Sequence, residues 1–423
     1  MKKKRSIGRI VVIAAICLIF AVLTIFGFAL PGSSQDSDFV GFARAINFGV
    51  EYKGGTVQTY SANLKTETKE DLQAGIASNA TRFKYLLLSE GYDVNTYQNG
   101  NNIVVEFFDE YSPVGIEEIL NAKTNFVIKT EESDSADAIV SASDVADAYA
   151  TKSGSQNVLV ITFTTDGATN FQKVIDNGTG YFYIGTNSPF SLSLSNASSS
   201  FVGIVMNSLE TAQSYASQIM AAKYDMSFEN IATVEYSKAD ANRNIVVLIV
   251  FVVALFVAAV VLLVVMYKTL GLVGGLTLFA GLLLQILLLQ AVPESVFTFT
   301  GASLFASLLS LALGALTLFV MYSNMHGEYK RGKILSASVK FGFNKSWAKM
   351  LDMYVAFFVP SVMAYFFGSF LVKQFAMSMM CGLVVYAFIT IVLTKFITKW
   401  LTFIKFKNKD YGFKREANVN ELR

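Results

Sequence analysis

The sequence predicts a membrane protein with six transmembrane helices and one large α+β domain outside the membrane. Its 423 residues are 53% hydrophobic and only 16% charged, which is outside the range of ordinary soluble domains. Six apolar stretches each reach the roughly 20 residues that a bilayer core about 30 Å thick requires. A single polar block, residues 31–243, separates the first stretch from the other five.

The predicted spans cover, in chain order, residues 10–30, 245–267, 270–292, 297–322, 350–372 and 375–394. The first span follows the basic start "MKKKRSIGR", so a secretory signal peptide is one interpretation. Its apolar run is longer than the roughly 7 to 15 residues usual in such peptides, which favours an uncleaved anchor. The small residues of "LPGSSQ" leave cleavage open as an alternative.

Charge is distributed unevenly along the chain. The block 31–243 holds 26 of the 32 acidic residues but only 13 of the 34 basic ones. Basic residues gather instead before the first span, between the fourth and fifth spans, and after the sixth. Because basic loops stay on the cytoplasmic side, we expect both termini in the cytoplasm and residues 31–243 outside a bacterial-type cytoplasmic membrane.

The polar block predicts a folded α+β domain. Strand-like "GGTVQTYSA", helical "TKEDLQAGIASNATRFKYLLLSEGY", strand-like "NNIVVEFF", helical "SPVGIEEILNAK" and strand-like "NFVIKT" follow one another. After the acidic "TEESDSADA", a second unit begins with "QNVLVITFT". We therefore predict a ferredoxin-like base from residues 45–130 and 207–240, with a head inserted at residues 131–206.

The predicted organisation has four parts. They are a cytoplasmic tail with the first span (1–30), the outer domain (31–243), a five-helix membrane region (244–395) and a basic cytoplasmic tail (396–423).

Enzyme chemistry has no support in the sequence. The outer block has no histidine, and its "YKGGT" lacks the spacing of a phosphate-binding loop, so a tight turn is the better interpretation. The two cysteines, Cys17 and Cys381, lie in predicted spans and have no metal-binding spacing. We expect no catalytic residues, no metal, no cofactor and no nucleic-acid partner.

Two stretches resemble the SecD family of protein-export subunits. "INFGVEYKGGT" is similar to that family's Gly-Leu-Asp-Leu-x-Gly-Gly segment: Gly49, Gly54 and Gly55 match, and Glu51 stands where aspartate is usual. "EYKRGKILSASVKFGFNKSWAKMLDMYVAFFVPSVMAYFFGSFLVKQFA" resembles the family's Glu-x-x-Arg-Gly-Lys stretch, Leu-Asp pair and Gly-x-x-x-Val-Lys-x-Phe-Ala hairpin. The matching residues of this second stretch include Arg331, Gly332, Lys333, Gly368 and Lys373.

The resemblance implies one half of a resistance-nodulation-division type transporter. In the SecD family, the extracytoplasmic domain holds emerging preproteins, and proton or sodium flow through the membrane part moves it. The implied partners are a SecF-like subunit, a SecY-type channel of the Sec translocon, unfolded preproteins and the lipid bilayer.

One family feature is missing from the fourth span. SecD proteins usually carry Asp-x-Asn there, and counting back from Arg331 places these positions at Leu316 and Leu318. Leucine takes up no proton, whereas intramembrane acids are usually functional. We therefore expect ion coupling to lie largely in the SecF-like partner.

Asp352 is the remaining ion-coupling candidate. It matches the aspartate of the family's Leu-Asp-Ala-Asn segment, although Tyr354 replaces the asparagine. We expect it about one turn inside the fifth span. One interpretation is a relay carboxylate, and the other is an interfacial acid paired with Lys349 or Lys345.

The sequence leaves three functional hypotheses open. The first is an accessory subunit of Sec-dependent export that contacts preproteins outside the membrane. The second is a degenerate SecD-like scaffold without ion coupling, motivated by Leu316 and Leu318. The third is a small-molecule or lipid exporter of the same superfamily, which the SecD motifs disfavour.

Overall fold

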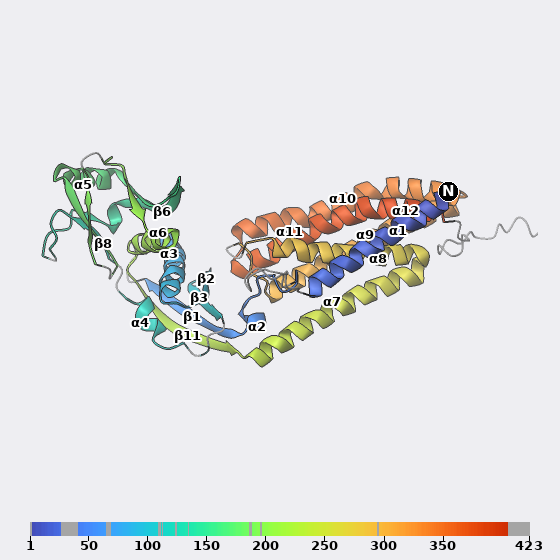
Figure 1. The fold of residues 1–423 in the computed structure, drawn as a ribbon, viewed down its shortest axis with the longest axis horizontal. Helices are drawn as coiled ribbons and strands as arrows, with labels where there is room; N and C mark the ends of the chain where they lie inside the picture. Colours follow the sequence, from blue (N-terminus) through green and yellow to red (C-terminus); the bar gives the residue numbers. More distant parts are fainter. Residues whose placement is uncertain are drawn as a thin grey trace, which may run out of the picture. The chain divides into compact units, whose positions relative to one another are not determined.

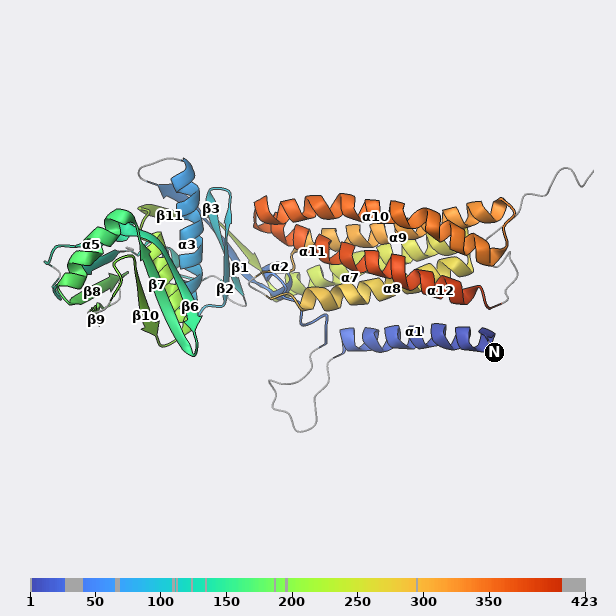
Figure 2. The same cartoon turned by 90° about the horizontal axis from the view of Figure 1, so that it is seen from above.

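The chain forms two compact units. The computed structural model describes residues 2–26, 41–64, 69–108, 111, 113–122, 125–133, 135–185, 188–194, 197–293 and 296–404. We call Met1–Tyr52 with Asn242–Arg423 the membrane unit, and Lys53–Ala241 the α+β unit. Figures 1 and 2 show the helices of the membrane unit and the sheets and helices of the α+β unit as ribbons.

Six helices of the described chain are long and apolar enough to cross a membrane, as predicted. The last of these spans is continuous across α11, a π-helical stretch and α12. The first five spans are α1 (Lys2–Ile25), α7 (Lys238–Tyr267), α8 (Thr269–Gln290), α9 (Gly301–Lys330) and α10 (Leu335–Phe367). The sixth consists of α11 (Phe370–Phe388), η3 (Ile389–Leu393) and α12 (Thr394–Leu401), and the short helix α2 (Val50–Lys53) precedes the first strand.

The fifth span differs from its predicted bounds of 350–372. Helix α10 begins at Leu335, so the basic segment before residue 350 continues the span as one helix. A Cβ atom at Gly342 would lie 2.5 Å from the Met325 Cα, so α9 and α10 approach closely there. The helix ends at Gly368, where a Cβ atom would lie 2.4 Å from the Ala364 carbonyl oxygen. Hydropathy alone missed this helix start because small, packed residues rather than apolar ones define it.

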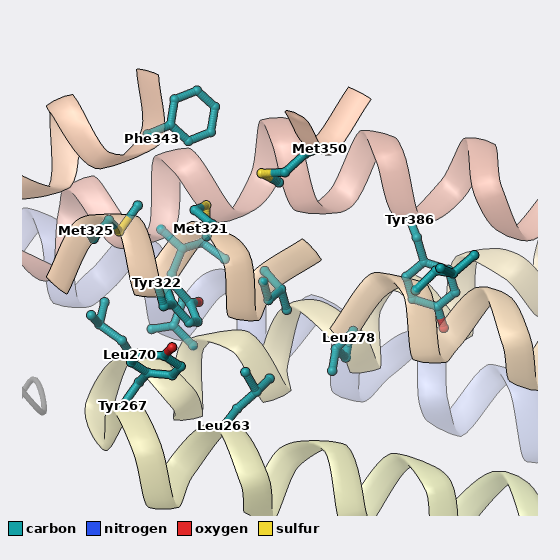
Figure 3. Close-up of a cluster of buried hydrophobic side chains, with 14 of the residues drawn as sticks. Leu263, Tyr267, Leu270, Leu278, Met321, Tyr322, Met325, Phe343, Met350 and Tyr386 are labelled. Atoms are coloured by element: carbon teal, nitrogen blue, oxygen red, sulfur yellow. The ribbon is translucent and has the colours of Figure 1, made fainter. Parts of the chain in front are cut away.

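Large side chains packed against glycine hold the membrane unit together. The rings and methionines of its core come from α7, α9, α10 and α11, and α8 adds Leu270 and Leu278 (Figure 3). Tyr386 covers two glycines: a Cβ atom at Gly281 would lie 2.5 Å from its Cε1, and one at Gly314 would lie 2.7 Å from its Cδ1. Helices α8, α9 and α11 therefore meet at close range, as small residues allow in membrane helix packing.

The base of the α+β unit is a four-stranded antiparallel sheet of order β11-β1-β3-β2. Its elements run β-α-β-β-α-β along the chain, with α6 packed beside α3, which is the predicted ferredoxin-like topology. The base elements are β1 (Gly55–Leu64), α3 (Lys69–Ser89), β2 (Val94–Asn99), β3 (Asn102–Phe108), α4 (Ile116–Leu120), α6 (Leu209–Ala221) and β11 (Met226–Tyr236).

The head is inserted between α4 and α6 and contains two antiparallel sheets, of orders β10-β7-β6 and β5-β4-β8-β9. Phe171 of α5 stacks on Phe163 of β7 with ring centroids 4.4 Å apart, which seats the helix on the first sheet. The head elements are β4 (Phe126–Lys129), β5 (Val140–Ser141), η2 (Ala142–Asp144), β6 (Val145–Ser153), β7 (Gln156–Phe163), α5 (Thr165–Asp176), β8 (Thr179–Ile184), β9 (Phe190–Ser193) and β10 (Phe201–Met206).

Two boundaries of the outer domain differ from the prediction. The strand-like "NFVIKT" was expected in the base, but β4 pairs with β5 and β8 of the head. The base sheet instead contains β2, which the sequence did not predict and which forms a hairpin with β3. Residues 41–52 also belong to the membrane unit rather than to the outer domain. Strand pairing is non-local, so propensity alone does not assign a strand to a sheet.

Candidate functional site

Helix α9 presents the two family positions in opposite environments. Leu318 is fully buried in the core of the membrane unit, whereas Leu316 is 48% exposed. The residue between them, Thr317, is also fully buried. Thr317 therefore supplies the buried polar side chain between the two leucines, and the sequence did not predict this role.

Three hydroxyl groups meet at this level, and we call them the hydroxyl junction. The Tyr354 Oη of α10 lies 2.9 Å from the Thr317 Oγ1 of α9 and 3.0 Å from the Thr390 Oγ1 of η3. Thr317 also contacts the Gly314 carbonyl oxygen at 2.7 Å, and Thr390 contacts the Tyr386 carbonyl oxygen at 2.6 Å.

The hydroxyl junction is a neutral network with fewer hydrogens than contacts. Each hydroxyl donates one hydrogen, so only three of the four contacts can be hydrogen bonds at any one time. Tyr354 of α10 therefore links α9 to η3. The junction can stabilise helix packing, but it contains no carboxylate to carry an ion-coupled step.

A second polar cluster lies between α8, α9 and α11. The Gln285 Nε2 lies 3.3 Å from the Ser310 Oγ, and the hydroxyls of Ser307 and Ser378 are 2.8 Å apart. A Cβ atom at Gly382 would lie 2.2 Å from the Ser310 Oγ, so glycine leaves the space in which these groups meet. Gln285 of α8 thus bonds across to α9.

A spacing signal could have located these residues in the sequence. Small and hydroxyl residues recur every three or four positions along α9 and every four along the last span, so each set lies on one face of its helix. On α9 they are Ser303, Ser307, Ser310, Gly314 and Thr317, and on the last span Ser378, Gly382, Tyr386 and Thr390.

The first SecD-like segment contacts the start of α9. The Glu51 carboxylate accepts a hydrogen bond from the Gly301 N–H, and the Asn244 side chain donates to the Glu51 carbonyl oxygen at 2.8 Å. The Gly49 N–H donates to the Phe299 carbonyl oxygen at 3.0 Å. A carboxylate at a helix N-terminus satisfies a free N–H and interacts favourably with the helix dipole. Residues 49–51 thus join α7 to the start of α9.

Glu51→Ala is expected to lower the stability of the membrane unit by about 0.5–2 kcal/mol, the usual cost of removing a side-chain acceptor at a helix N-terminus. Glu51→Gln is the matched control, because its amide oxygen can still accept from Gly301. Thermal unfolding of the purified protein in detergent measures both. Equal melting temperatures for the two variants would contradict a role for the acceptor.

The Glu51 contact also predicts a pH dependence. Burial raises the pKa of the Glu51 carboxyl above its ordinary value of 4.5, and the Gly301 N–H acts in the opposite direction. A carboxyl with a raised folded pKa favours the folded state at low pH and loses this contribution as pH rises through that pKa. The melting temperature of the wild type should therefore fall, relative to Glu51→Gln, as pH rises above 4.5. A constant difference would contradict the raised pKa.

The glycine pair of the same segment forms a turn in the α+β unit. Gly54 and Gly55 have φ angles of 94° and 131°, in the region where other residues are strained. A Cβ atom at Gly54 would also lie 2.8 Å from the Tyr111 hydroxyl. The pair leads directly into β1, which agrees with the tight turn predicted for "YKGGT".

The second SecD-like stretch begins with an ion-paired turn. Arg331 and Lys333 both pair with Glu328, the former at 2.8 Å, and Gly332 between them has a φ of 88°. This turn follows the C-terminal end of α9, whereas Glu51 lies at its N-terminal end. Thirty residues of helix span about 45 Å, so this turn lies far from Glu51.

Asp352 lies in the middle of α10 rather than near its start, because the helix begins at Leu335. Its side chain is exposed, whereas Tyr354, two positions later and so on nearly the opposite face, is buried. Among the described residues, no ion pair joins it to Lys349 or Lys345. The structure therefore separates Asp352 from the hydroxyl junction. Lys373 is exposed in the first turn of α11, after the hairpin at Gly368.

The head exposes an apolar sheet face. On the edge strand β10, Phe201 and Val205 are 52% and 58% exposed, and Tyr149 of β6 is 46% exposed. Val160 of the central strand β7 pairs with Gly203 on one side and with Tyr149 on the other, so these residues share one face. We call the surface formed by Tyr149, Val160, Phe201, Gly203 and Val205 the head face. Contiguous exposed apolar surface of this kind marks interaction sites.

Within the described part of the chain, no group of three or more His, Cys, Asp or Glu residues is placed to hold a metal ion.

The chain resembles SecD proteins in sequence. It is 26% identical over 141 residues to the protein translocase subunit SecD of Elusimicrobium minutum, and 28% identical over 132 residues to that of Acidaminococcus fermentans. These alignments cover 33% and 31% of this chain, and 29% and 31% of the relatives. No protein-family model matches the chain.

The fold is that of SecDF over nearly the whole chain. A SecDF crystal structure in a super-membrane-facing form matches 96% of this chain with a TM-score of 0.64 and 16% identity. SecDF from Thermus, described as a translocon-associated membrane protein, matches 98% of it with a TM-score of 0.56 and 17% identity. The chain covers 58% and 60% of these two structures. The six-span bundle with a large α+β domain is thus confirmed.

Proposed function

We propose that this chain is an accessory subunit of Sec-dependent protein export. The observation that carries the proposal is the match of nearly the whole chain to the SecDF fold, together with SecD-like motifs at both ends of α9. A structural likeness at 16% identity supports a common architecture, and the motifs connect it to export.

In this proposal, the α+β unit contacts translocating preproteins through the head face. Unfolded chains expose apolar side chains, and an exposed sheet face with Phe201, Val205 and Tyr149 offers them a complementary surface. The α+β unit then lies outside the cytoplasmic membrane and both termini lie in the cytoplasm, as the basic segments favour.

The membrane unit is proposed to pair with a SecF-like subunit beside a SecY-type channel. The chain covers 58% of a SecDF structure, and the proposed SecF-like subunit would correspond to the remaining part of that structure. Asp352, exposed on α10, is an ion-coupling candidate that such a partner could cover, because intramembrane acids usually face protein or water. Since Leu316, Leu318 and the hydroxyl junction provide no carboxylate, ion coupling is proposed to lie largely in the partner.

Deletion of the gene in its native host is expected to slow preprotein processing. Pulse labelling of several secreted proteins measures the rate of processing. Re-expression of the wild-type chain should restore processing. Normal export kinetics in a clean deletion would refute the proposal. Gentle purification from native membranes, with mass spectrometry of bound proteins, tests the partners: recovery of a SecF-like protein and channel subunits supports the pairing, and their absence contradicts it.

A second candidate is a SecD-like scaffold without ion coupling of its own, which the neutral hydroxyl junction favours. In that case Asp352→Asn and collapse of the ion gradient should leave the contribution of this subunit to export unchanged. If Asp352→Asn lowers export as much as deletion does, while the variant protein accumulates normally, the scaffold hypothesis is wrong.

A further inference from the structure

We propose that a cavity at the basic end of the membrane unit binds the phosphodiester headgroup of an anionic glycerophospholipid. The cavity has a volume of about 310 Å³ and is lined by the last turns of α9, the first turns of α10, and α12 with the residues after it. It is distinct from the hydroxyl junction and from the SecD-like turn at Arg331 to Lys333, none of whose residues line it.

The charged residues of the cavity lining are basic. Lys340, Lys395 and Lys399 line it, and no acidic residue of the described chain does. The Lys395 Nζ lies 4.7 Å from the centroid of the Phe343 ring, so this ammonium group rests on an apolar surface instead of pairing with a carboxylate. Three lysines without an acidic partner in the lining attract an anion.

The position of the cavity indicates a lipid. Helices α9, α10 and α12 end or begin at Lys330, Leu335 and Leu401, so the cavity lies where spans leave the bilayer. Nearby, the Arg9 guanidinium lies 5.3 Å from the Trp400 ring centroid, a pairing typical of the membrane interface.

The apolar part of the lining suits the region of a lipid next to its phosphate. Met325, Phe343 and Phe403 lie in the same wall as the lysines and can contact glycerol and the first methylene groups. Basic pockets between transmembrane helices bind anionic headgroups in this way. The lining thus offers separate surfaces for the charged and the apolar parts of one ligand.

Native mass spectrometry of the full-length protein in detergent tests the proposal. The probes are phosphatidylglycerol and phosphatidylcholine with identical acyl chains, and the wild type is expected to bind phosphatidylglycerol more tightly. The cavity variant K340Q/K395Q/K399Q is expected to lose this preference, by about fivefold for each lysine that contacts the phosphate.

A matched control separates the cavity from general surface charge. K268Q/K345Q/K349Q removes the same number of exposed lysines outside the cavity and is expected to keep the preference. Equal loss in both triple variants, or no preference in the wild type, would overturn the proposal. Protection of the protein from thermal unfolding by inorganic phosphate as strong as that by phosphatidylglycerol would overturn the lipid assignment. Because purified protein is used, these outcomes are independent of the proposed role in export.

Discussion

Leu318→Asp is expected to unfold most of the membrane unit, whereas Leu316→Asp should leave far more of it folded. Both variants carry the cost of an acid in a transmembrane helix, about 2.5–3.5 kcal/mol. Only Leu318 is fully buried in the core, so its loss adds about 2–5 kcal/mol for the packing of a large apolar side chain. An unpaired buried carboxylate increases this cost further.

The total cost of Leu318→Asp is comparable to the whole stability of a typical protein, about 5–15 kcal/mol, and the difference between the two variants is about 2–5 kcal/mol or more. The fraction of monodisperse protein in mild detergent, with its melting temperature, measures it. Leu318→Met serves as the control for a change of side chain without charge or large loss of volume. Equal losses for the two aspartate variants would mean that α9 presents other faces to its neighbours than those described.

The double variant F201D/V205D is expected to reduce crosslinking of the α+β unit to an arrested preprotein about tenfold or more. Both side chains are more than half exposed, so their replacement should change stability by only about 0.5 kcal/mol each. On binding, each would contribute part of the roughly 1.5–3 kcal/mol gained by burying a large apolar side chain. Two charges on the head face remove this gain and add a desolvation cost.

Val114→Asp is the matched control for the head face. Val114 is 86% exposed in the same unit, but it lies outside the head, in the loop before α4. It should therefore keep wild-type crosslinking, measured with a photoreactive residue at Tyr149 in every variant. If the double variant crosslinks as strongly as the wild type while remaining folded, preproteins do not bind through the head face.

Hydropathy predicted the six spans because membrane insertion is largely a local property. Each span satisfies its backbone hydrogen bonds within itself, so a window of about 20 residues contains the necessary information. The same argument explains the error at α10. Its first turns, from Leu335, carry lysines and hydroxyl groups, and a hydropathy window places the span start near residue 350.

Part of the candidate site was visible in the sequence, and part was not. The resemblance to SecD located Glu51, Leu316, Leu318 and Asp352. It did not reveal that Glu51 contacts Gly301, since 250 positions separate the two residues.

The sequence by itself determined the class of the protein, the number of its spans and the ferredoxin-like base, because composition and local pattern specify these properties. Tertiary structure alone decided that β4 belongs to the head, that Leu316 and Leu318 face opposite environments, and that Tyr354 joins Thr317 and Thr390. The physical reason is that strand pairing and helix rotation depend on contacts between residues far apart in the chain, which no local pattern contains.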